Sequence, residues 1–328
     1  MQDQDRQNQD MRDKEISEPD RAAHQQRLAQ GAVLDQQLLS TIPRQAAPFA
    51  VLASPSWRGV DAEIFVLTLP QSNFILKQYS SEHRVYINLA TSFQAAYIAG
   101  GLSIAPEVVY RDLGQQCVVM HELGVDWRCA GLQDLAHPIR RQNIIAAKKV
   151  FQQHATALIS QPSQQIFQQI FDLAAQVRVD PRLCPAQLSQ WLLWSQDMQQ
   201  RIEAEGGDQA PCHRDGNISN VMIGPQDAIQ LLDYDMAAWA DPLEDLGCFI
   251  MEAHESKHTA QAGFEEWQGY FNALQFERAW CYGILDDLRW GLIALTLASI
   301  SSRQHLEFAK YAAWRLLRFK THRQQLSI

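Results

Sequence analysis

The chain has 328 residues, 46% of them hydrophobic, and a formal net charge of −9 at pH 7. This length is sufficient for one large domain or for two lobes that each bury a core. The acidic balance argues against wholesale binding to nucleic acid or to an anionic membrane, although it leaves room for a local cationic pocket.

The N-terminal part, up to about residue 45, is polar, and we expect a partly disordered extension there. Its first 20 residues contain no apolar core and so no signal peptide. The longest apolar run, residues 291–300, is too short to span a bilayer and predicts a buried core helix. Six scattered cysteines without a CxxC pair predict a reduced, cytoplasmic protein.

Residues 46–122 predict a small β-rich lobe. Three runs of β-branched and aromatic residues are separated by turn-forming residues, which indicates an antiparallel meander, and Lys77 lies in the third run. Residues 82–99 show helical spacing, and residues 105–123 predict two more strands around a glycine turn. We therefore expect about five strands and one helix. The three runs are FAVLAS (49–54), EIFVLTL (63–69) and NFILKQY (73–79).

Residues 123–328 predict a larger lobe that is mostly helical. The exception is a pair of short apolar runs, VMIG at 221–224 and AIQLLDYD at 228–235, joined by a tight turn. This pattern predicts one β-hairpin embedded among helices. The expected fold class is α+β, with a small antiparallel β lobe followed by a larger helical lobe and a cleft between them that favours an active site.

Three polar residues flank the predicted hairpin. Asp215 and Asn220 lie in the loop that enters it, and Asp233 lies where its second strand ends. Since a tight turn brings the two open ends of a hairpin side by side, these side chains should converge. Two carboxylates and an amide oxygen are ligands that suit Mg²⁺. One carboxylate left off the metal could accept a hydroxyl proton, which is what phosphoryl transfer requires.

Two motifs carry a resemblance to a known family. HRDGNISN at 213–220 matches the H-x-D-x-x-x-x-N catalytic loop of kinases. LDYDMAAWADPLEDL at 232–246 resembles the pattern I-D-[WFY]-[ED]-x-A-x-x-x-D-P-x-x-D-L of the aminoglycoside phosphotransferase and choline kinase family. The resemblance extends weakly over most of residues 46–320.

The resemblance implies a two-lobed, protein-kinase-like fold with ATP and Mg²⁺ in the cleft. It implies an ATP- and Mg²⁺-dependent phosphotransferase acting on a hydroxyl of a small molecule, such as choline, ethanolamine, an aminoglycoside, a sugar or an amino acid. The residues that it assigns are Asp215 as catalytic base; Asn220 and Asp233 as Mg²⁺ ligands; Lys77 at the ATP phosphates; Met120, His121, Glu122 and Leu123 as the linker beside adenine; and His213 and Asp245 as supports of the loop.

The chain departs from the family pattern in the small lobe. The family has a glutamate on the small-lobe helix that pairs with the strand lysine, but no acid occurs between Glu82 and Glu107. For Lys77 the stand-in could be Asn88 or Gln94, or Glu82 could reach from the start of the helix. The expected phosphate loop, residues 54–63, contains a single glycine, Gly59.

Two other classes of function stay open. The missing helix glutamate suggests, as one alternative, that the protein is a pseudokinase or a nucleotide-binding scaffold. A metal hydrolase could use His213, Asp215, Asp233 and His254. It would leave Asn220 and Lys77 unexplained. Arg214 is interpreted as a surface charge or a charge that stabilises the loop.

The acceptor is not identified by the sequence. Tryptophan and tyrosine are frequent in the C-terminal helices, where core packing is the default interpretation. In choline kinases, aromatic residues of this region cage a quaternary ammonium through cation–π contacts. Asp286, Asp287 and Glu265 could add negative charge for an amine.

Overall fold

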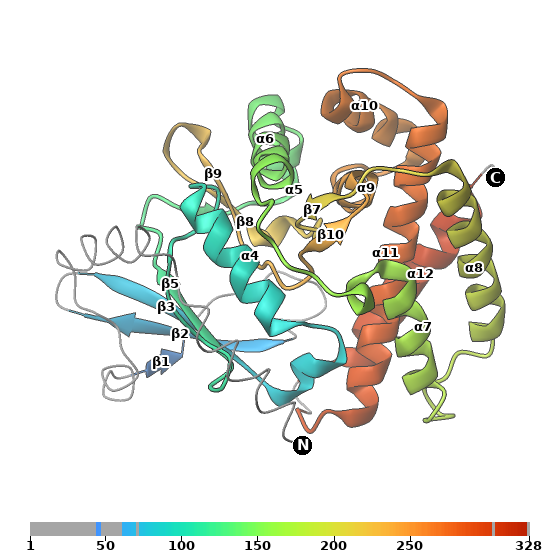
Figure 1. Cartoon of the computed structure of the whole chain (residues 1–328), viewed down its shortest axis with the longest axis horizontal. Helices are drawn as coiled ribbons and strands as arrows, with labels where there is room; N and C mark the ends of the chain where they lie inside the picture. Colours follow the sequence, from blue (N-terminus) through green and yellow to red (C-terminus); the bar gives the residue numbers. More distant parts are fainter. Residues whose placement is uncertain (1–43, 47–60, 70–71, 304–305, 327–328) are drawn as a thin grey trace.

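The computed structural model describes residues 44–46, 61–69, 72–303 and 306–326. Of the extension expected up to about residue 45, residues 1–43 lie outside these described residues, whereas Arg44 and Gln45 belong to a strand. The strand expected at 49–54 and Gly59 also lie outside them. Within them the fold is α+β and two-lobed, with a β-sheet at one end and a mainly helical part at the other (Figure 1).

The small lobe is a five-stranded antiparallel sheet in the order β1-β2-β3-β5-β4, with helix α4 along one face (Figure 1). Leu76 and Val119 belong to an apolar cluster on one face of the sheet, whereas Tyr79 and Val118 face the main core. Lys77 shares the second face. The elements are β1 (Arg44–Ala46), β2 (Ala62–Thr68), β3 (Asn73–Tyr79), α4 (Leu89–Gly101), β4 (Val108–Asp112) and β5 (Cys117–His121).

The helix predicted at 82–99 is shorter at its start than expected. Residues Ser81–Val85 form a separate 3₁₀ turn, η1, and α4 begins at Leu89. The cause is Asn88, whose side-chain oxygen accepts the backbone N–H groups of Ala90 at 3.1 Å and Thr91 at 3.2 Å. Such an N-cap fixes where a helix begins.

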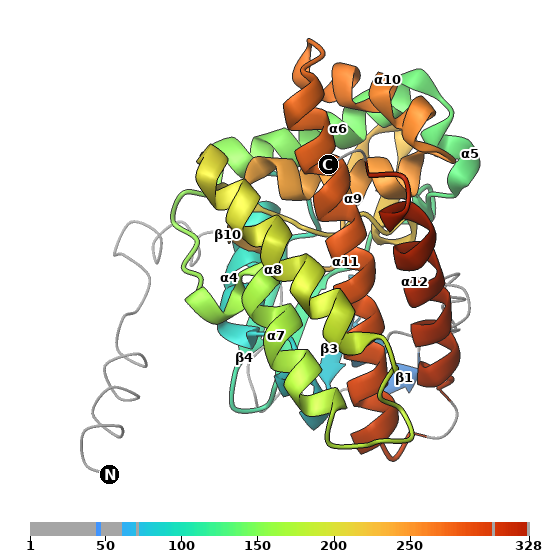
Figure 2. The same ribbon diagram turned by 90° about the vertical axis from the view of Figure 1, so that its right-hand side faces the viewer.

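The large lobe is arranged around α11 (Ala273–Ile300), which packs against α7, α9 and α12 (Figure 2). The apolar run 291–300 forms the last turns of α11 and is buried as far as Leu297. Among the described residues, no helix has the length and apolar character needed to cross a membrane. The other helices are α5 (Leu132–Leu135), α6 (Pro138–His154), η2 (Pro162–Gln164), α7 (Ile166–Val177), α8 (Leu188–Glu205), α9 (Pro242–Ala253), α10 (Lys257–Gln268) and α12 (Phe308–Arg323).

Two small sheets interrupt these helices. The predicted hairpin is present as β8 (Val221–Ile223) and β9 (Ile229–Leu231), joined through η4 (Pro225–Asp227). A short strand, β6 (Arg128–Cys129), extends it at β8. The sequence did not predict β7 (Ala210–Cys212), which pairs with β10 (Ala238–Ala240) and brings the start of the HRDGNISN loop beside the start of α9.

Helices α9 and α11 cross at two glycines. A Cβ atom on Gly247 would lie 2.1 Å from the carbonyl oxygen of Ala279, and one on Gly283 would lie 2.7 Å from the carbonyl oxygen of Gly247. Only residues without a side chain permit this approach. The crossing matters for the site because α9 carries Asp245.

We predict that Gly247→Ala forces α9 away from α11 and lowers the free energy of unfolding by about 1–3 kcal/mol, as overpacking in a core does. Thermal or urea unfolding of the purified protein measures it. Gly101→Ala is the matched control: nothing lies within 4 Å of its added methyl group, so its stability should stay the same or rise slightly. Equal stability of the two variants would contradict the close crossing.

Candidate active site

The HRDGNISN loop brings Asp215 into contact with Asn220. Asp215 lies between β7 and the single turn η3 (Ile218–Asn220). One carboxylate oxygen accepts the backbone N–H of Asn217 at 2.7 Å, and the other accepts the side-chain amide of Asn220 at 2.6 Å. The carbonyl oxygen of Asn220 accepts the N–H of Leu232 at 2.7 Å, which ties the loop to the end of β9.

Asp233 follows directly and completes this group at the open end of the hairpin. Its backbone has φ 62°, a left-handed conformation that is uncommon outside glycine and that concentrates at functional sites. Burial raises the pKa of Asp233, Lys77 opposes the rise, and Asp61 and Asp215 add to it. The hydrogen bond between the preceding residue, Leu232, and Asn220 places Asp233 beside the loop. Burial also raises the pKa of Asp215 to about 6, against the hydrogen bonds from Asn217 and Asn220.

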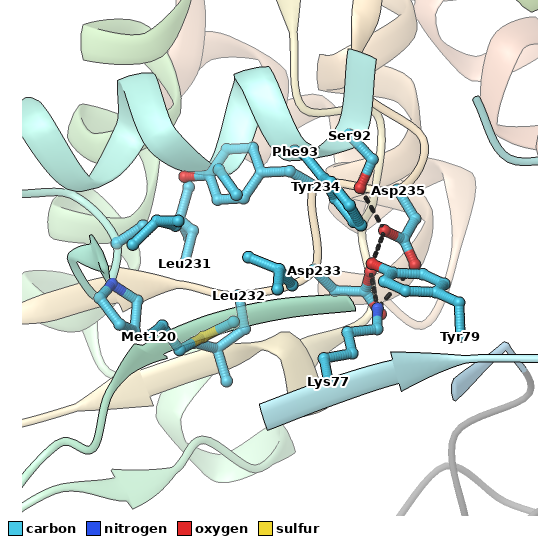
Figure 3. A pocket seen from close by; sticks show the side chains of 15 residues that line it. Lys77, Tyr79, Ser92, Phe93, Met120, Leu231, Leu232, Asp233, Tyr234 and Asp235 are labelled. Carbon is cyan, nitrogen blue, oxygen red and sulfur yellow. Dashed lines mark hydrogen bonds and ion pairs between the residues drawn. The ribbon is translucent and has the colours of Figure 1, made fainter. Parts of the chain in front are cut away.

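Lys77 lies among three carboxylates, and Figure 3 shows two of them, Asp233 and Asp235. Its ammonium nitrogen is 2.7 Å from Asp61, 3.0 Å from Asp233 and 2.6 Å from Asp235. Burial alone would lower the pKa of Lys77, but the charges of Asp233, Asp235 and Asp61 outweigh it and raise the pKa well above its usual value. The lysine thus has acidic partners, and they come from β2's start and from the LDYD segment.

None of the stand-ins expected from the sequence contacts Lys77. Asn88 caps α4 through its side-chain oxygen. Gln94 donates to the carbonyl oxygen of Ala157 and accepts the N–H of Ile159, both at 2.9 Å. Glu82 accepts a hydrogen bond at 2.9 Å from Arg303. These expectations were wrong because each side chain has a nearer partner.

A mainly apolar pocket opens beside Lys77, between α4, the sheet and the β9 end of the hairpin (Figure 3). Met120 is one of its lining residues, but His121, Glu122 and Leu123 are not among them. The backbone N–H of His121 donates to Glu107 at 3.0 Å, and that of Glu122 donates to Asn73 at 3.2 Å. Other lining residues are Phe93, Ala105, Pro106, Val108, Val118 and Leu231.

Lys148 and Asp245 form a buried ion pair that contacts the backbone of the HRDGNISN loop. Asp245 accepts the backbone N–H groups of His213 at 3.3 Å and Arg214 at 3.0 Å. Lys148 of α6 lies 2.9 Å from Asp245 and donates to the carbonyl oxygen of Asp215 at 2.8 Å. Burial raises the pKa of Asp245, but Lys148 and His213 outweigh it, so the pKa lies below its usual value.

Sequence reasoning missed Lys148, although a signal was present. The buried residues Ile144, Ile145 and Phe151 place position 148 on the inner face of α6 at helical spacing. A lysine on such a face needs an acidic partner, because a buried charge is costly unless it is paired. What the sequence could not supply was the identity of that partner, which is 97 residues away.

His213 is a structural residue of the loop. Its Nδ1 faces Lys148 at 3.2 Å and its Nε2 faces the carbonyl oxygen of Leu232 at 3.0 Å, so Nε2 carries the proton that is donated. Burial, and then Lys148, lower its pKa to about 4. The metal hydrolase interpretation loses its support, since both nitrogens of His213 have partners and His254 lies against Gly263 of α10.

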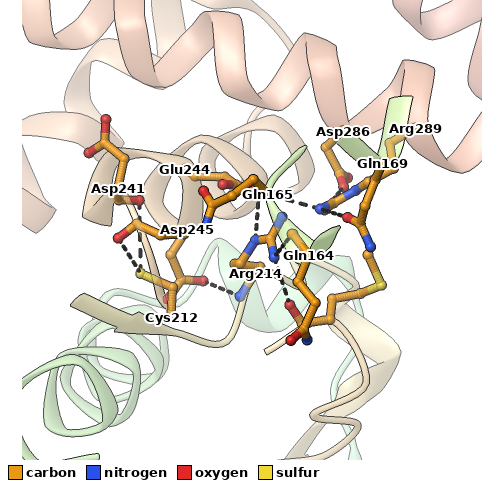
Figure 4. Close-up of polar contacts among 12 residues, drawn as sticks. Gln164, Gln165, Gln169, Cys212, Arg214, Asp241, Glu244, Asp245, Asp286 and Arg289 are labelled. Carbon is orange, nitrogen blue, oxygen red and sulfur yellow. Dashed lines mark hydrogen bonds and ion pairs between the residues drawn. The ribbon is translucent and has the colours of Figure 1, made fainter. Parts of the chain in front are cut away.

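Arg214 is buried rather than on the surface, and it anchors the loop to the helical lobe (Figure 4). Its Nε donates to Glu244 of α9 at 2.6 Å, and its Nη1 donates to the carbonyl oxygens of Gln164 at 2.8 Å and Met236 at 3.3 Å. Glu244 also lies 3.4 Å from Arg289 of α11. Of the two roles considered for Arg214, the geometry favours stabilisation of the loop.

The acids considered for binding an amine have other partners or lie elsewhere. Asp286 is 2.6 Å from Arg289 and 2.7 Å from Arg315. Asp287 is 3.0 Å from Arg315 and 3.3 Å from Arg318. Glu265 is exposed on α10. Several of the aromatic residues, including Trp267, Trp280 and Tyr282, are core residues, as the default interpretation expects.

The comparisons with known proteins agree with this geometry. The model of the phosphotransferase enzyme family, APH, matches residues 53–283, and the chain belongs to that family. No curated protein sequence gave a match.

Solved structures share the kinase-like fold. A choline/ethanolamine kinase family protein from Mesorhizobium loti is 18% identical, with a TM-score of 0.68 over 91% of this chain and 94% of that one. Choline kinase LicA from Streptococcus pneumoniae is 14% identical, with a TM-score of 0.68 over 93% and 99%. A spectinomycin phosphotransferase in complex with ADP and spectinomycin is 12% identical, with a TM-score of 0.54 over 90% and 100%.

We predict that Lys148→Met lowers the free energy of unfolding by about 3–5 kcal/mol, because it leaves Asp245 buried without its cation. Adding Asp245→Asn should recover part of the loss by removing the unpaired charge. Urea unfolding measures both. The control is Lys310→Met, whose exposed pair with Glu307 should contribute less than about 1 kcal/mol. A loss for Lys148→Met as small as that of the control would contradict the assignment.

Proposed function

We propose that the chain transfers a phosphoryl group from ATP, with Mg²⁺, to a hydroxyl group of a small molecule. The observation that carries the proposal is the contact of Asp215 with Asn220 at the same hairpin end as Asp233, with Lys77 3.0 Å from Asp233. Family membership supports phosphotransfer, and structures of relatives solved with ADP or AMP support the use of a nucleotide. A cytoplasmic location stays a prediction.

The residues present fit a divalent cation. Because the Asn220 amide nitrogen donates to Asp215, its side-chain oxygen is free to bind a cation. The Asp233 side chain is 28% exposed and faces the cleft, whereas those of Asp61 and Asp235 are 11% and 6% exposed. Mg²⁺ held by Asn220 and Asp233 would neutralise charge on the phosphate oxygens. We assign these two residues as its ligands.

In the proposed reaction Asp215 accepts the proton of the substrate hydroxyl. The oxygen of that hydroxyl forms a bond to the γ-phosphorus of ATP, and the bond between this phosphorus and the oxygen of the leaving ADP breaks. The hydrogen bonds from Asn217 and Asn220 orient the carboxylate without occupying all of its lone pairs. Lys77 would donate to the phosphates. The backbone N–H groups of His121 and Glu122 in the linker already form hydrogen bonds within the protein. Adenine would therefore contact the carbonyl groups of these two residues, or Leu123.

The observation that suggested a pseudokinase does not hold in the structure. It rested on a strand lysine without an acidic partner, but Lys77 has three carboxylates within 3.0 Å. The acceptor stays open among amino alcohols, aminoglycosides, sugars and amino acids.

We predict that a panel of amino alcohols, aminoglycosides, sugars and amino acids, incubated with ATP and Mg²⁺, contains one class whose product gains a phosphate by mass spectrometry. Asp215→Asn should lower kcat for that product by about 10²–10⁴-fold, the usual contribution of a general base, while ADP still binds. A variant that turns over at the wild-type rate would contradict the role of Asp215.

We predict that Asp233→Asn abolishes the effect of Mg²⁺ on nucleotide binding. Calorimetric titration of ADP with and without Mg²⁺ measures it: the wild type should bind ADP more tightly with the metal, and the variant should not distinguish the two conditions. Asp227→Asn, in the turn at the other end of the same hairpin, is the control and should behave as wild type. Mg²⁺-enhanced binding by Asp233→Asn would contradict the assignment.

A further inference from the structure

The strand lysine of this chain is held without an acid on the small-lobe helix. Where such an acid would reach Lys77, helix α4 presents Ser92, and both residues line the same pocket. Ser92 does not contact Lys77. Its hydroxyl donates to Asp235 at 2.6 Å, and the other oxygen of Asp235 lies 2.6 Å from the lysine nitrogen (Figure 3). The helix therefore reaches the lysine through an aspartate of the large lobe.

Asp61 approaches the same nitrogen from the small lobe. It directly precedes β2, and its carbonyl oxygen accepts the N–H of Ser80 at 3.2 Å, which fixes it beside the end of β3. Its Oδ2 lies 2.7 Å from Lys77 as an ion pair without the angles of a hydrogen bond. Asp61 and Lys77 are each 9% exposed, so water screens this attraction little.

The three acids around Lys77 differ in how well they can stay paired with it when a nucleotide and a metal bind. Asp233 faces the cleft and is the ligand that we assign to Mg²⁺, so the metal would compete with Lys77 for its carboxylate. Asp235 already accepts the hydroxyl groups of Tyr79 and Ser92, both at 2.6 Å. Asp61 has neither duty. It is thus the acid best suited to hold Lys77 when Asp233 turns to the metal.

We infer that Asp61, together with Asp235 and Ser92, replaces the helix glutamate as the device that positions Lys77 for the phosphates of the nucleotide. Asp61 is a positioning residue and acts through Lys77. The inference rests on the proposed function, because it presupposes a nucleotide in the cleft. It goes beyond the proposed function by assigning this role to Asp61, which lies in neither of the two sequence motifs.

Because Asp61 is one of three acids around Lys77, its substitution should affect thermal stability and nucleotide affinity differently. Three carboxylates around one ammonium repel one another, so Asp61→Asn relieves a surplus of negative charge and should not lower the melting temperature. The same change should weaken ADP–Mg²⁺ binding by about 10- to 100-fold, the usual effect of removing a partner that orients a binding residue. A residue that only maintained the fold would lower stability and affinity together.

The test places an acid back on α4. Calorimetry of ADP with Mg²⁺ and thermal unfolding are measured for wild type, Asp61→Asn, Asp61→Asn/Ser92→Glu and Asp61→Asn/Ser92→Gln. A glutamate at 92 can reach Lys77 directly and should recover at least tenfold in affinity, whereas glutamine, of equal size and no charge, should not. Glu63→Gln removes an exposed charge from β2, two residues after Asp61, and should bind as wild type.

The outcomes separate the two proposals. An Asp61→Asn variant that binds ADP–Mg²⁺ within about twofold of wild type overturns the inference and leaves the proposed function standing. Equal rescue by glutamate and glutamine also overturns it, because packing rather than charge would then be responsible. A wild-type chain that binds no nucleotide overturns the proposed function and the inference together. Loss in Asp61→Asn with recovery only by glutamate supports both.

Discussion

The arrangement of the two lobes depends on the ammonium group of Lys77. It is carried by β3 of the small lobe, and two of its three acidic partners, Asp233 and Asp235, follow β9 in the large lobe. A buried cation is tolerated only when it is paired, so the sheet must stay where these carboxylates are. One of these partners, Asp233, has a left-handed backbone conformation, which costs of order 1–3 kcal/mol and persists only where its surroundings determine it.

A second set of buried charges holds the HRDGNISN loop, which has little regular structure of its own. Arg214 contacts Glu244 of α9, Glu244 lies near Arg289 of α11, and a further pair leads from Arg289 to Asp286 (Figure 4). Asp286 in turn lies 2.7 Å from Arg315 of α12. The charges alternate along this path. Helices α11 and α12, which carry no motif, therefore help to determine where the HRDGNISN loop lies, and the close crossing of α9 and α11 becomes a condition for the site.

The parts that the sequence predicted well are local. Asp215, Asn220 and Asp233 are separated by few residues, and one hairpin turn suffices to bring them together. The small antiparallel lobe and the helical lobe also follow from short-range patterns. The parts that it missed are contacts between distant segments: Lys148 with Asp245, Arg214 with Glu244, and Asp61 with Lys77. The helical spacing of apolar residues in α6 indicates that Lys148 is buried, and a buried lysine requires an acidic partner. Only the packing of the helices determines which acid becomes that partner.

The central claim is that Lys77 is held between the lobes so that it can exchange Asp233 for the phosphates of a nucleotide. A crystal structure with ADP and Mg²⁺ tests it most directly. We expect the metal about 2.0–2.1 Å from oxygens of Asp233 and Asn220. The nitrogen of Lys77 should lie about 3 Å from a phosphate oxygen and keep its contacts with Asp61 and Asp235. A nucleotide bound away from this cleft, or a Lys77 that stays on Asp233 while the metal is held elsewhere, would contradict the account.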